Sequence, residues 1–232
     1  MVHQEGDNDR MIIAIDGPAG AGKSSVARKV AEQLGYVYID TGSMYRAVTL
    51  MAQRARVTVE QTAKLADLVK SLEIELEPGE QGQSVFVNGE DVTALIRTRE
   101  VTLQVSHIAA NETVREVLGI MQRKLAERKG VVMDGRDIGS HVLPQAELKI
   151  FLTASVKERA LRRYREIVDS QSITLAQLET EIAERDRLDE QRDISPLICA
   201  PDAIVLDSTA MTIDEVIHAI VKLSRTKLAE AK

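Results

Sequence analysis

Short apolar runs rich in Val, Ile and Leu alternate along the chain with longer amphipathic stretches. The runs are almost continuously apolar, which is typical of strands that are covered on both faces in a parallel sheet. We expect strands at residues 11–15, 36–39, 131–133, 148–152 and 203–206.

The stretches between these runs repeat their apolar residues with a helical period. In residues 24–34 the apolar positions form one stripe, and Gly35, a residue type common after helix ends, follows directly. Alternation of strands and helices at this spacing predicts an α/β fold in which helices flank a five-stranded parallel sheet. We expect helices at residues 24–34, 43–54, 59–72, 111–129, 155–169, 174–189 and 213–231.

One stretch departs from this alternation. Residues 73–77 and 84–87 alternate apolar and polar positions with the period of two that strands show, and a turn rich in Pro and Gly separates them. Asn88-Gly89 follows, and this pair is a strong signal for a tight hairpin turn. Residues 73–96 are therefore predicted to form a small antiparallel β lobe inserted in the α/β domain.

The strongest motif of the chain is G-x-x-x-x-G-K-S between the first predicted strand and the first predicted helix, where a phosphate-binding P-loop must lie. Its glycines let the backbone N–H groups surround a phosphate, Lys23 can reach the β- and γ-oxygens, and the Ser24 hydroxyl can bind Mg²⁺. The motif predicts binding of ATP or GTP in a P-loop NTPase fold. Its members are Gly17, Pro18, Ala19, Gly20, Ala21, Gly22, Lys23 and Ser24.

Composition excludes several classes of protein. The 232 residues are 44% hydrophobic and 28% charged, which suits a folded domain with a solvated surface. The formal charge of −6 and the 3% of aromatic residues argue against a general nucleic-acid coat protein. Cys199 is the single cysteine, so an intramolecular disulfide and a Cys-rich zinc module are excluded.

Membrane and export signals are also missing from the pattern. The apolar run at residues 11–15 is far shorter than the roughly 20 residues of a membrane span. Residues 1–10 are polar and acidic, unlike a secretory signal peptide. We expect a cytoplasmic protein with a disordered leader at residues 1–10.

The rest of the sequence narrows the class of P-loop protein. A GTPase needs a D-x-x-G switch and an N-K-x-D base reader, but Asp134 is followed by Gly-Arg-Asp and the chain has no Asn-Lys pair. Motor and transporter ATPases are usually larger. A small phosphotransferase is the better fit, and it needs cations around a second anionic substrate. Candidates are Arg46 after the second strand; Asp134, Arg136 and Asp137 after the third strand; and Arg185, Asp189 and Arg192, which are spaced as one face of a helix.

Seven segments together resemble the bacterial cytidylate kinases of the nucleoside monophosphate kinase family, from about Met11 to the C-terminus. They are IDGPAGAGKSS, DTGSMYRA, IRTREV, MDGRDIG, KIFLTASVKERALRR, EIAERDRLDEQRDISPL and APDAIVLDST. The resemblance implies transfer of the γ-phosphate of ATP to CMP or dCMP with Mg²⁺. It also implies a kinase core of residues 11–72 and 97–232, with a mobile lid within 155–192, and a monophosphate-binding role for the lobe at 73–96.

The resemblance further implies a role for individual residues. It makes Lys23, Arg136 and Arg192 catalytic, and it adds Ser25 and either Arg162 or Arg163 to the P-loop as ATP-binding residues. The Mg²⁺ ligand stays open between Ser24, Ser25 and water-mediated contacts from Asp40 or Asp134. The implied CMP contacts are Ser106, Arg115 and Asp137 for cytosine, Arg185 and Asp189 for ribose, Arg46, Arg136 and Arg192 for phosphate, and the Thr41 hydroxyl.

Two other functions stay open on the sequence alone. One is a kinase for another monophosphate such as UMP or AMP, and the other is a regulatory NTP-binding module whose arginines hold RNA or a protein. The acidic balance and the few aromatic side chains speak against RNA, because stacking platforms are scarce. We expect ATP and CMP or dCMP as the only partners of a monomer, with no nucleic acid and no membrane.

Overall fold

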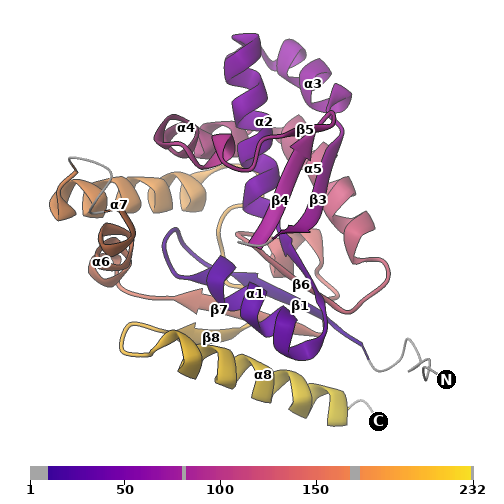
Figure 1. The fold of residues 1–232 in the computed structure, drawn as a ribbon, viewed down its shortest axis with the longest axis vertical. Helices are drawn as coiled ribbons and strands as arrows, with labels where there is room; N and C mark the ends of the chain where they lie inside the picture. The colour runs from indigo at the N-terminus through magenta and orange to yellow at the C-terminus, as the bar shows by residue number, and fades with distance from the viewer. Residues whose placement is uncertain (1–9, 80–81, 168–172, 231–232) are drawn as a thin grey trace. The chain divides into compact units, whose positions relative to one another are not determined.

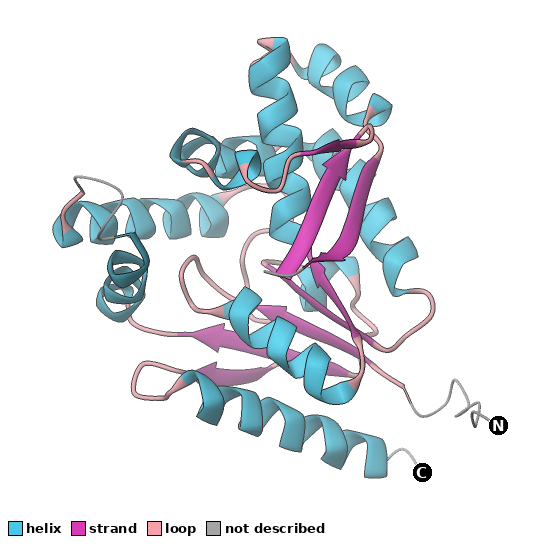
Figure 2. Cartoon of the chain, in the orientation of Figure 1, coloured by secondary structure: helices cyan, strands magenta, loops and turns pink. Residues whose placement is uncertain are grey.

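The chain is built on a five-stranded sheet with the order β2-β6-β1-β7-β8 (Figures 1 and 2). The computed structural model describes residues 10–79, 82–167 and 173–230. Strand β1 pairs in parallel with β6 and β7, and β7 pairs in parallel with β8. All five predicted strands are present, with ends shifted by one or two residues. They are β1 (Ile12–Asp16), β2 (Val37–Asp40), β6 (Val131–Gly135), β7 (Leu148–Thr153) and β8 (Ile204–Asp207).

The chain divides into two units. The first comprises the described residues of Met1–Tyr38, Ala126–Gln191 and Ser195–Lys232, and the second comprises those of Ile39–Leu125 and Arg192–Ile194. The sequence analysis predicted a different division, with a core of residues 11–72 and 97–232 and an inserted lobe at residues 73–96. That domain division stays a prediction.

Four helices and a short π-helical turn complete the first unit. They are α1 (Lys23–Leu34), α6 (Val156–Ile167), α7 (Leu175–Gln191), α8 (Ile213–Glu230) and the turn at Ile138–Val142. The apolar stripe of α1 packs with α8 and with Ile13 and Ile15 of β1 in one buried cluster. Each fully buried Val or Ile side chain of this cluster contributes about 1.5–3 kcal/mol. As predicted, α1 ends at Leu34 and is followed by Gly35, whose φ of 65° is the left-handed conformation that glycine adopts most easily.

The second unit carries the predicted antiparallel lobe, and the lobe has a third strand that the sequence pattern missed. Its order is β3-β4-β5, and the segment joining β3 to β4 includes residues 80–81, which lie outside the described residues. Val85 and Val87 of β4 are buried in the core of this unit. The elements are α2 (Thr41–Ala55), α3 (Thr62–Ser71), β3 (Ile74–Gly79), β4 (Gly82–Val87), β5 (Glu90–Asp91), a 3₁₀ turn at Leu95–Arg97, α4 (Arg99–Ala109) and α5 (Glu112–Ala126).

Several predicted helix ends were wrong. Helix α5 stops at Ala126 rather than at residue 129, because Lys129 and Gly130 have φ of 50° and 62°, which a helix cannot accommodate. Helix α4 was not predicted at all. The predicted ends at residues 169 and 231, and the predicted leader except Arg10, fall outside the described residues. Within the described ranges, no helix is both long enough and apolar enough to cross a membrane.

Candidate active site

The P-loop leaves β1 at Asp16 and enters α1 at Lys23, as the motif predicts. Gly17, Gly20 and Gly22 have φ of 147°, 74° and 87°, in the region that favours glycine. A Cβ atom on Gly17 would lie 2.0 Å from the carbonyl oxygen of Leu152, so a larger residue does not fit there. The loop therefore has the backbone conformation and the tight packing that explain its glycines.

Lys23 is a nearly buried cation at the start of α1. Its side chain donates from Nζ to the carbonyl oxygen of Pro18 at 2.7 Å, and 5% of the residue is exposed. Burial lowers the pKa of Lys23 well below its usual value, and the nearby Arg136 and Arg185 lower it further, against the opposing effect of Asp134. Burial and the neighbouring arginines thus both disfavour the charged form of this lysine.

Arg136 and Arg185 join Lys23 in one cationic cluster. Arg136 donates from Nε to Oδ2 of Asp189 at 2.9 Å, so the strand-end motif and α7 meet as predicted. Burial lowers the pKa of Arg185 to about 10, and repulsion from Arg136 adds to the shift, while Asp189 and Asp186 oppose it. The Nε atom of Arg185 is buried and has no hydrogen-bond partner in the part of the chain that is described. A buried donor and crowded cations together favour an anionic ligand.

Ser24 and Asp134 form the oxygen-rich side of the site. Ser24 donates from Oγ to Oδ2 of Asp134 at 2.9 Å, and Tyr38 donates from Oη to Oδ1 at 2.9 Å. Sequence reasoning missed Tyr38, because one tyrosine in a strand carries no motif. Across the described ranges, no three His, Cys, Asp or Glu side chains gather into a group that could hold a metal ion. A cation here would need the hydroxyl, the carboxylate and oxygens of a ligand.

Asp16 is a further buried carboxyl that sequence reasoning missed. Its two oxygens accept hydrogen bonds from the backbone N–H groups of Ile138 at 2.8 Å and Gly139 at 2.7 Å. Burial raises the pKa of Asp16 to about 6, although these two hydrogen bonds oppose the shift. Asp137, which is 4% exposed, directly precedes the two N–H groups. Asp16 therefore fixes the backbone beside a predicted cytosine-reading residue, and its place between β1 and Gly17 was the signal for it.

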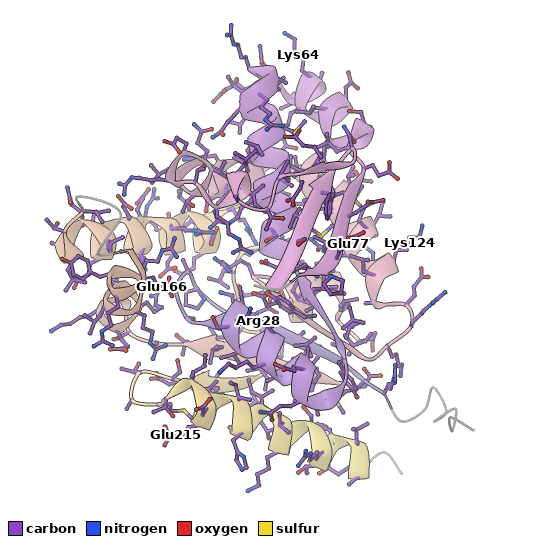
Figure 3. All side chains as sticks on the ribbon, viewed as in Figure 1. Arg28, Lys64, Glu77, Lys124, Glu166 and Glu215 are labelled. Atoms are coloured by element: carbon purple, nitrogen blue, oxygen red, sulfur yellow. The ribbon has the colours of Figure 1, made fainter. Side chains whose placement is uncertain are left out.

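The remaining ATP-side candidates lie on two helices of the first unit. Arg162 of α6 donates to Oγ of Ser208 at 3.1 Å and to its carbonyl oxygen at 2.6 Å, so it holds the segment after β8. Arg163 pairs with Glu166 at 2.8 Å on the exposed side of α6, where Figure 3 labels Glu166. Ser25 is exposed in the first turn of α1.

The second unit holds the other predicted CMP contacts. Arg46 of α2 donates from Nη1 to Oγ1 of Thr102 at 2.7 Å and to the carbonyl oxygen of Ile96 at 3.3 Å. The guanidinium of Arg115 lies 5.3 Å from the centre of the Tyr45 ring. Arg115 also donates from Nη1 to the carbonyl oxygen of Ala109 at 2.9 Å. These contacts hold both arginines in fixed positions.

Three more candidates occupy buried positions in this unit. Thr41 begins α2, and Ser106 lies on α4, where 7% of it is exposed. Asp40 caps α2, because its two oxygens accept hydrogen bonds from the N–H group of Ser43 at 3.0 Å and from its hydroxyl at 2.6 Å. These capping hydrogen bonds explain why a carboxylate is buried at Asp40 without a metal ion.

The predicted position of Arg192 was wrong. Helix α7 ends at Gln191, so Arg192 is the first residue beyond it and does not share a helical face with Arg185 and Asp189. It is 8% exposed and is grouped with the second unit. Helical spacing holds only while the helix continues, and the predicted helix at residues 174–189 already stopped short of Arg192.

A P-loop on a parallel sheet, with a buried lysine and arginines beside it, defines the protein as a P-loop phosphotransferase. The family model for cytidylate kinase matches residues 13–226. A cytidylate kinase of Exiguobacterium sibiricum is 56% identical over 217 residues, which are 93% of this chain and 97% of that protein. A cytidylate kinase of Bacillus cereus is 53% identical over 215 residues, which are 92% of this chain and 96% of that protein. The chain belongs to the cytidylate kinase family.

A solved structure supports the fold alone. An uncharacterized protein from Eubacterium ventriosum is 12% identical, with a TM-score of 0.52, over 94% of this chain and 99% of that chain. At that identity the likeness extends to the architecture and not to the chemistry of the site.

Proposed function

We propose that the protein transfers the γ-phosphate of ATP to CMP or dCMP, giving ADP and CDP or dCDP. Membership of the cytidylate kinase family supports the reaction. The observation that carries the chemistry is the cluster of the buried Lys23 with the partly buried Arg136 and Arg185 beside the P-loop, in which burial and the neighbouring arginines lower the pKa of the lysine. Such a cluster is stabilised when phosphate oxygens bring negative charge to it.

The P-loop is proposed to hold the phosphates of ATP. Its backbone N–H groups and the start of α1 provide partial positive charge, and Lys23 is proposed to leave the Pro18 carbonyl for the transferring phosphate. Ser25 and Arg162 are proposed as further ATP-binding residues. Arg162 could act directly or by holding the segment at Ser208, and the second role matches its hydrogen bonds.

Mg²⁺ is proposed as the metal cofactor. The Ser24 hydroxyl and the Asp134 carboxylate are hard oxygen donors, and Mg²⁺ usually takes few protein ligands together with substrate phosphates and water. When bound, Mg²⁺ neutralises charge on the phosphates. In this proposal Tyr38 orients the carboxylate of Asp134 through its hydrogen bond.

CMP supplies a nucleophile that is already ionised at neutral pH, so the reaction needs cations rather than a general base. Arg46, Arg136 and Arg192 are proposed to hold its phosphate, with Arg136 and Arg192 also contacting the group in transfer. The remaining proposed contacts are Arg185 and Asp189 with the ribose, Ser106, Arg115 and Asp137 with cytosine, and Thr41 with CMP through its hydroxyl.

Several features of the whole chain belong to the same proposal. The segment 155–192 is proposed to include a lid that excludes water, since ATP would otherwise be hydrolysed. The lobe at 73–96 is assigned to the monophosphate side. We also propose a monomer that acts in the cytoplasm, with no nucleic-acid partner.

Label transfer tests the proposal directly. Wild-type protein is incubated with ATP carrying a labelled γ-phosphate, Mg²⁺ and CMP, and the products are separated. We expect the label in CDP, and expect little release of labelled phosphate when CMP is left out. Label that appears only as free phosphate would contradict the proposal, because it would indicate an ATPase without this acceptor.

A further inference from the structure

A buried ion pair joins α6 to α7 next to the P-loop. Nη1 of Arg159 lies 2.7 Å from Oδ2 of Asp186, and the two side chains are 5% and 11% exposed. Nε of Arg159 also donates to the carbonyl oxygen of Ala154 at 2.8 Å. Removing two charges from water is costly, so a pair this deeply buried calls for a role beyond surface attraction.

Both partners of this pair bind the same residue of the P-loop. Asp186 accepts a hydrogen bond from the N–H group of Ala19 at 3.1 Å, and Arg159 donates to the carbonyl oxygen of Ala19 at 2.7 Å. The next residue, Gly20, is packed so closely that a Cβ there would lie 3.2 Å from Cβ of Arg159 and 3.7 Å from Ile182 of α7. The P-loop is therefore held at the N–H group and the carbonyl oxygen of Ala19 and by close packing at Gly20.

The same pair fixes the helix that carries the proposed ribose contacts. Asp186 follows Arg185 directly and precedes Asp189 by less than one turn of α7, and Asp189 binds Arg136 at 2.9 Å. Because a helix moves as a rigid element, holding Asp186 against Ala19 sets the position of these neighbours relative to the P-loop.

We propose that Arg159 and Asp186 are positioning residues that set the P-loop and α7 in one fixed arrangement, so that one buried ion pair supports both nucleotide sites. The inference rests on the proposed phosphotransfer function and adds two residues to it. Neither residue touches the reacting atoms in this proposal. They act through Ala19 on one side and through Arg185 and Asp189 on the other.

Asp186→Asn tests the pair with little change of shape. The amide oxygen can still accept from the Ala19 N–H group, but the charge that pairs with Arg159 is lost. The matched control is Glu184→Gln on the same helix, whose carboxylate forms an exposed pair with Arg187 at 2.6 Å. Steady-state rates give the KM values for ATP and CMP and kcat, and calorimetric titration with a non-hydrolysable ATP analogue gives binding without turnover.

We expect Asp186→Asn to raise both KM values and to weaken analogue binding, each by about 10- to 100-fold, because small misplacements of binding groups are costly. Glu184→Gln is expected to stay within about twofold of wild type. Arg159→Lys should resemble Asp186→Asn, since one ammonium cannot replace a guanidinium that holds two carbonyls and a carboxylate. If Asp186→Asn lowers the melting temperature but leaves both KM values within about twofold, the pair only stabilises the fold and the proposal is overturned.

A measurement on the wild-type protein keeps the proposal testable if the variants do not fold. Without nucleotide, the Ala19 amide should exchange its hydrogen at least about 100-fold more slowly than an unstructured peptide. An unprotected Ala19 amide would overturn the proposal. Absence of CDP formation by wild type would instead refute the proposed function. Analogue titration and hydrogen exchange would still test the positioning role of the ion pair in that case.

Discussion

At the scale of single residues, Lys23 is unusual because a strongly hydrated cation lies almost buried among other cations. Its ammonium donates a hydrogen bond to the carbonyl oxygen of Pro18, and its pKa is lowered by burial and by Arg136. Folding therefore gains little from this charge, and the position is explained by a phosphate ligand rather than by stability.

Lys23→Met should separate activity from stability. Methionine keeps the apolar stem and removes the charge that would contact the transferring phosphate, so kcat is expected to fall by about 10³-fold or more. The free energy of unfolding should change by no more than about 1 kcal/mol, because a single hydrogen bond is lost and repulsion is relieved. Retention of more than about a tenth of wild-type kcat would exclude the proposed role.

Asp137→Asn tests how cytosine is distinguished from uracil. Cytosine presents an N–H₂ donor at position 4 where uracil presents an oxygen, so a carboxylate attracts the first base and repels the second. A charged hydrogen bond contributes about 1.5–3 kcal/mol. We expect kcat/KM for CMP to fall and the CMP-to-UMP ratio to narrow by about 10- to 150-fold. An equal loss for both substrates would mean that Asp137 only braces the segment.

Asp16 provides a prediction about pH. Its pKa in the folded protein is about 6, above the ordinary value of 3.8, so folding favours the protonated form. The stabilising contribution of Asp16 is therefore complete below pH 3.8 and is lost as the pH rises through 6; its full size is about 3 kcal/mol. The ¹³C signal of the carboxyl carbon should titrate near pH 6. A midpoint near 3.8 would contradict the buried environment, and Asp202, whose pKa is lowered by its hydrogen bond to Lys149, serves as the internal reference.

At the scale of elements, β4 links the inserted lobe to the core of the second unit. The sequence pattern treated residues 73–96 as an appendage, but Val85 and Val87 are 0% and 2% exposed within the same apolar cluster as α2, α4 and α5. A deletion of the whole lobe would therefore remove part of that core. Point substitutions are the better probe of this element.

Val85→Ala should lower the free energy of unfolding by about 2 kcal/mol, because it removes buried methyl groups and leaves a cavity. The matched control is Val37→Ala, another valine in a strand, which is 60% exposed and should change stability by no more than about 0.5 kcal/mol. Chemical denaturation measures both variants. Equal effects of the two substitutions would mean that β4 does not contribute to the core.

The elements also show what the sequence could predict. Period and motif placed all five strands of the sheet and the P-loop, because each depends on neighbouring residues in the chain. Helix α4 was missed, although Thr98, a residue type that is common at N-caps, precedes it. The helical face assigned to Arg192 extended past the end of α7 at Gln191. The contacts of Asp16 with Ile138 and of Asp186 with Ala19 join residues far apart in sequence. Such contacts arise only from the folded arrangement.

At the scale of the whole molecule, an acidic chain contains a strongly basic site. The formal charge is −6, yet Lys23, Arg136 and Arg185 gather beside the P-loop in the first unit. Local placement rather than net charge therefore decides which ligand is attracted. A local basic site of this kind suits a small nucleotide with several phosphate charges even on an acidic chain.

The most direct test of the central claim is a comparison of acceptors. Initial rates of diphosphate formation are measured with MgATP and with CMP, dCMP, UMP, AMP or RNA, each over a range of concentrations. The account predicts kcat/KM for CMP or dCMP that exceeds the values for UMP and AMP by at least about tenfold, the lower limit of one charged hydrogen bond, and no effect of RNA on ADP release. Equal rates for all monophosphates, or ADP release that does not depend on the acceptor, would contradict it.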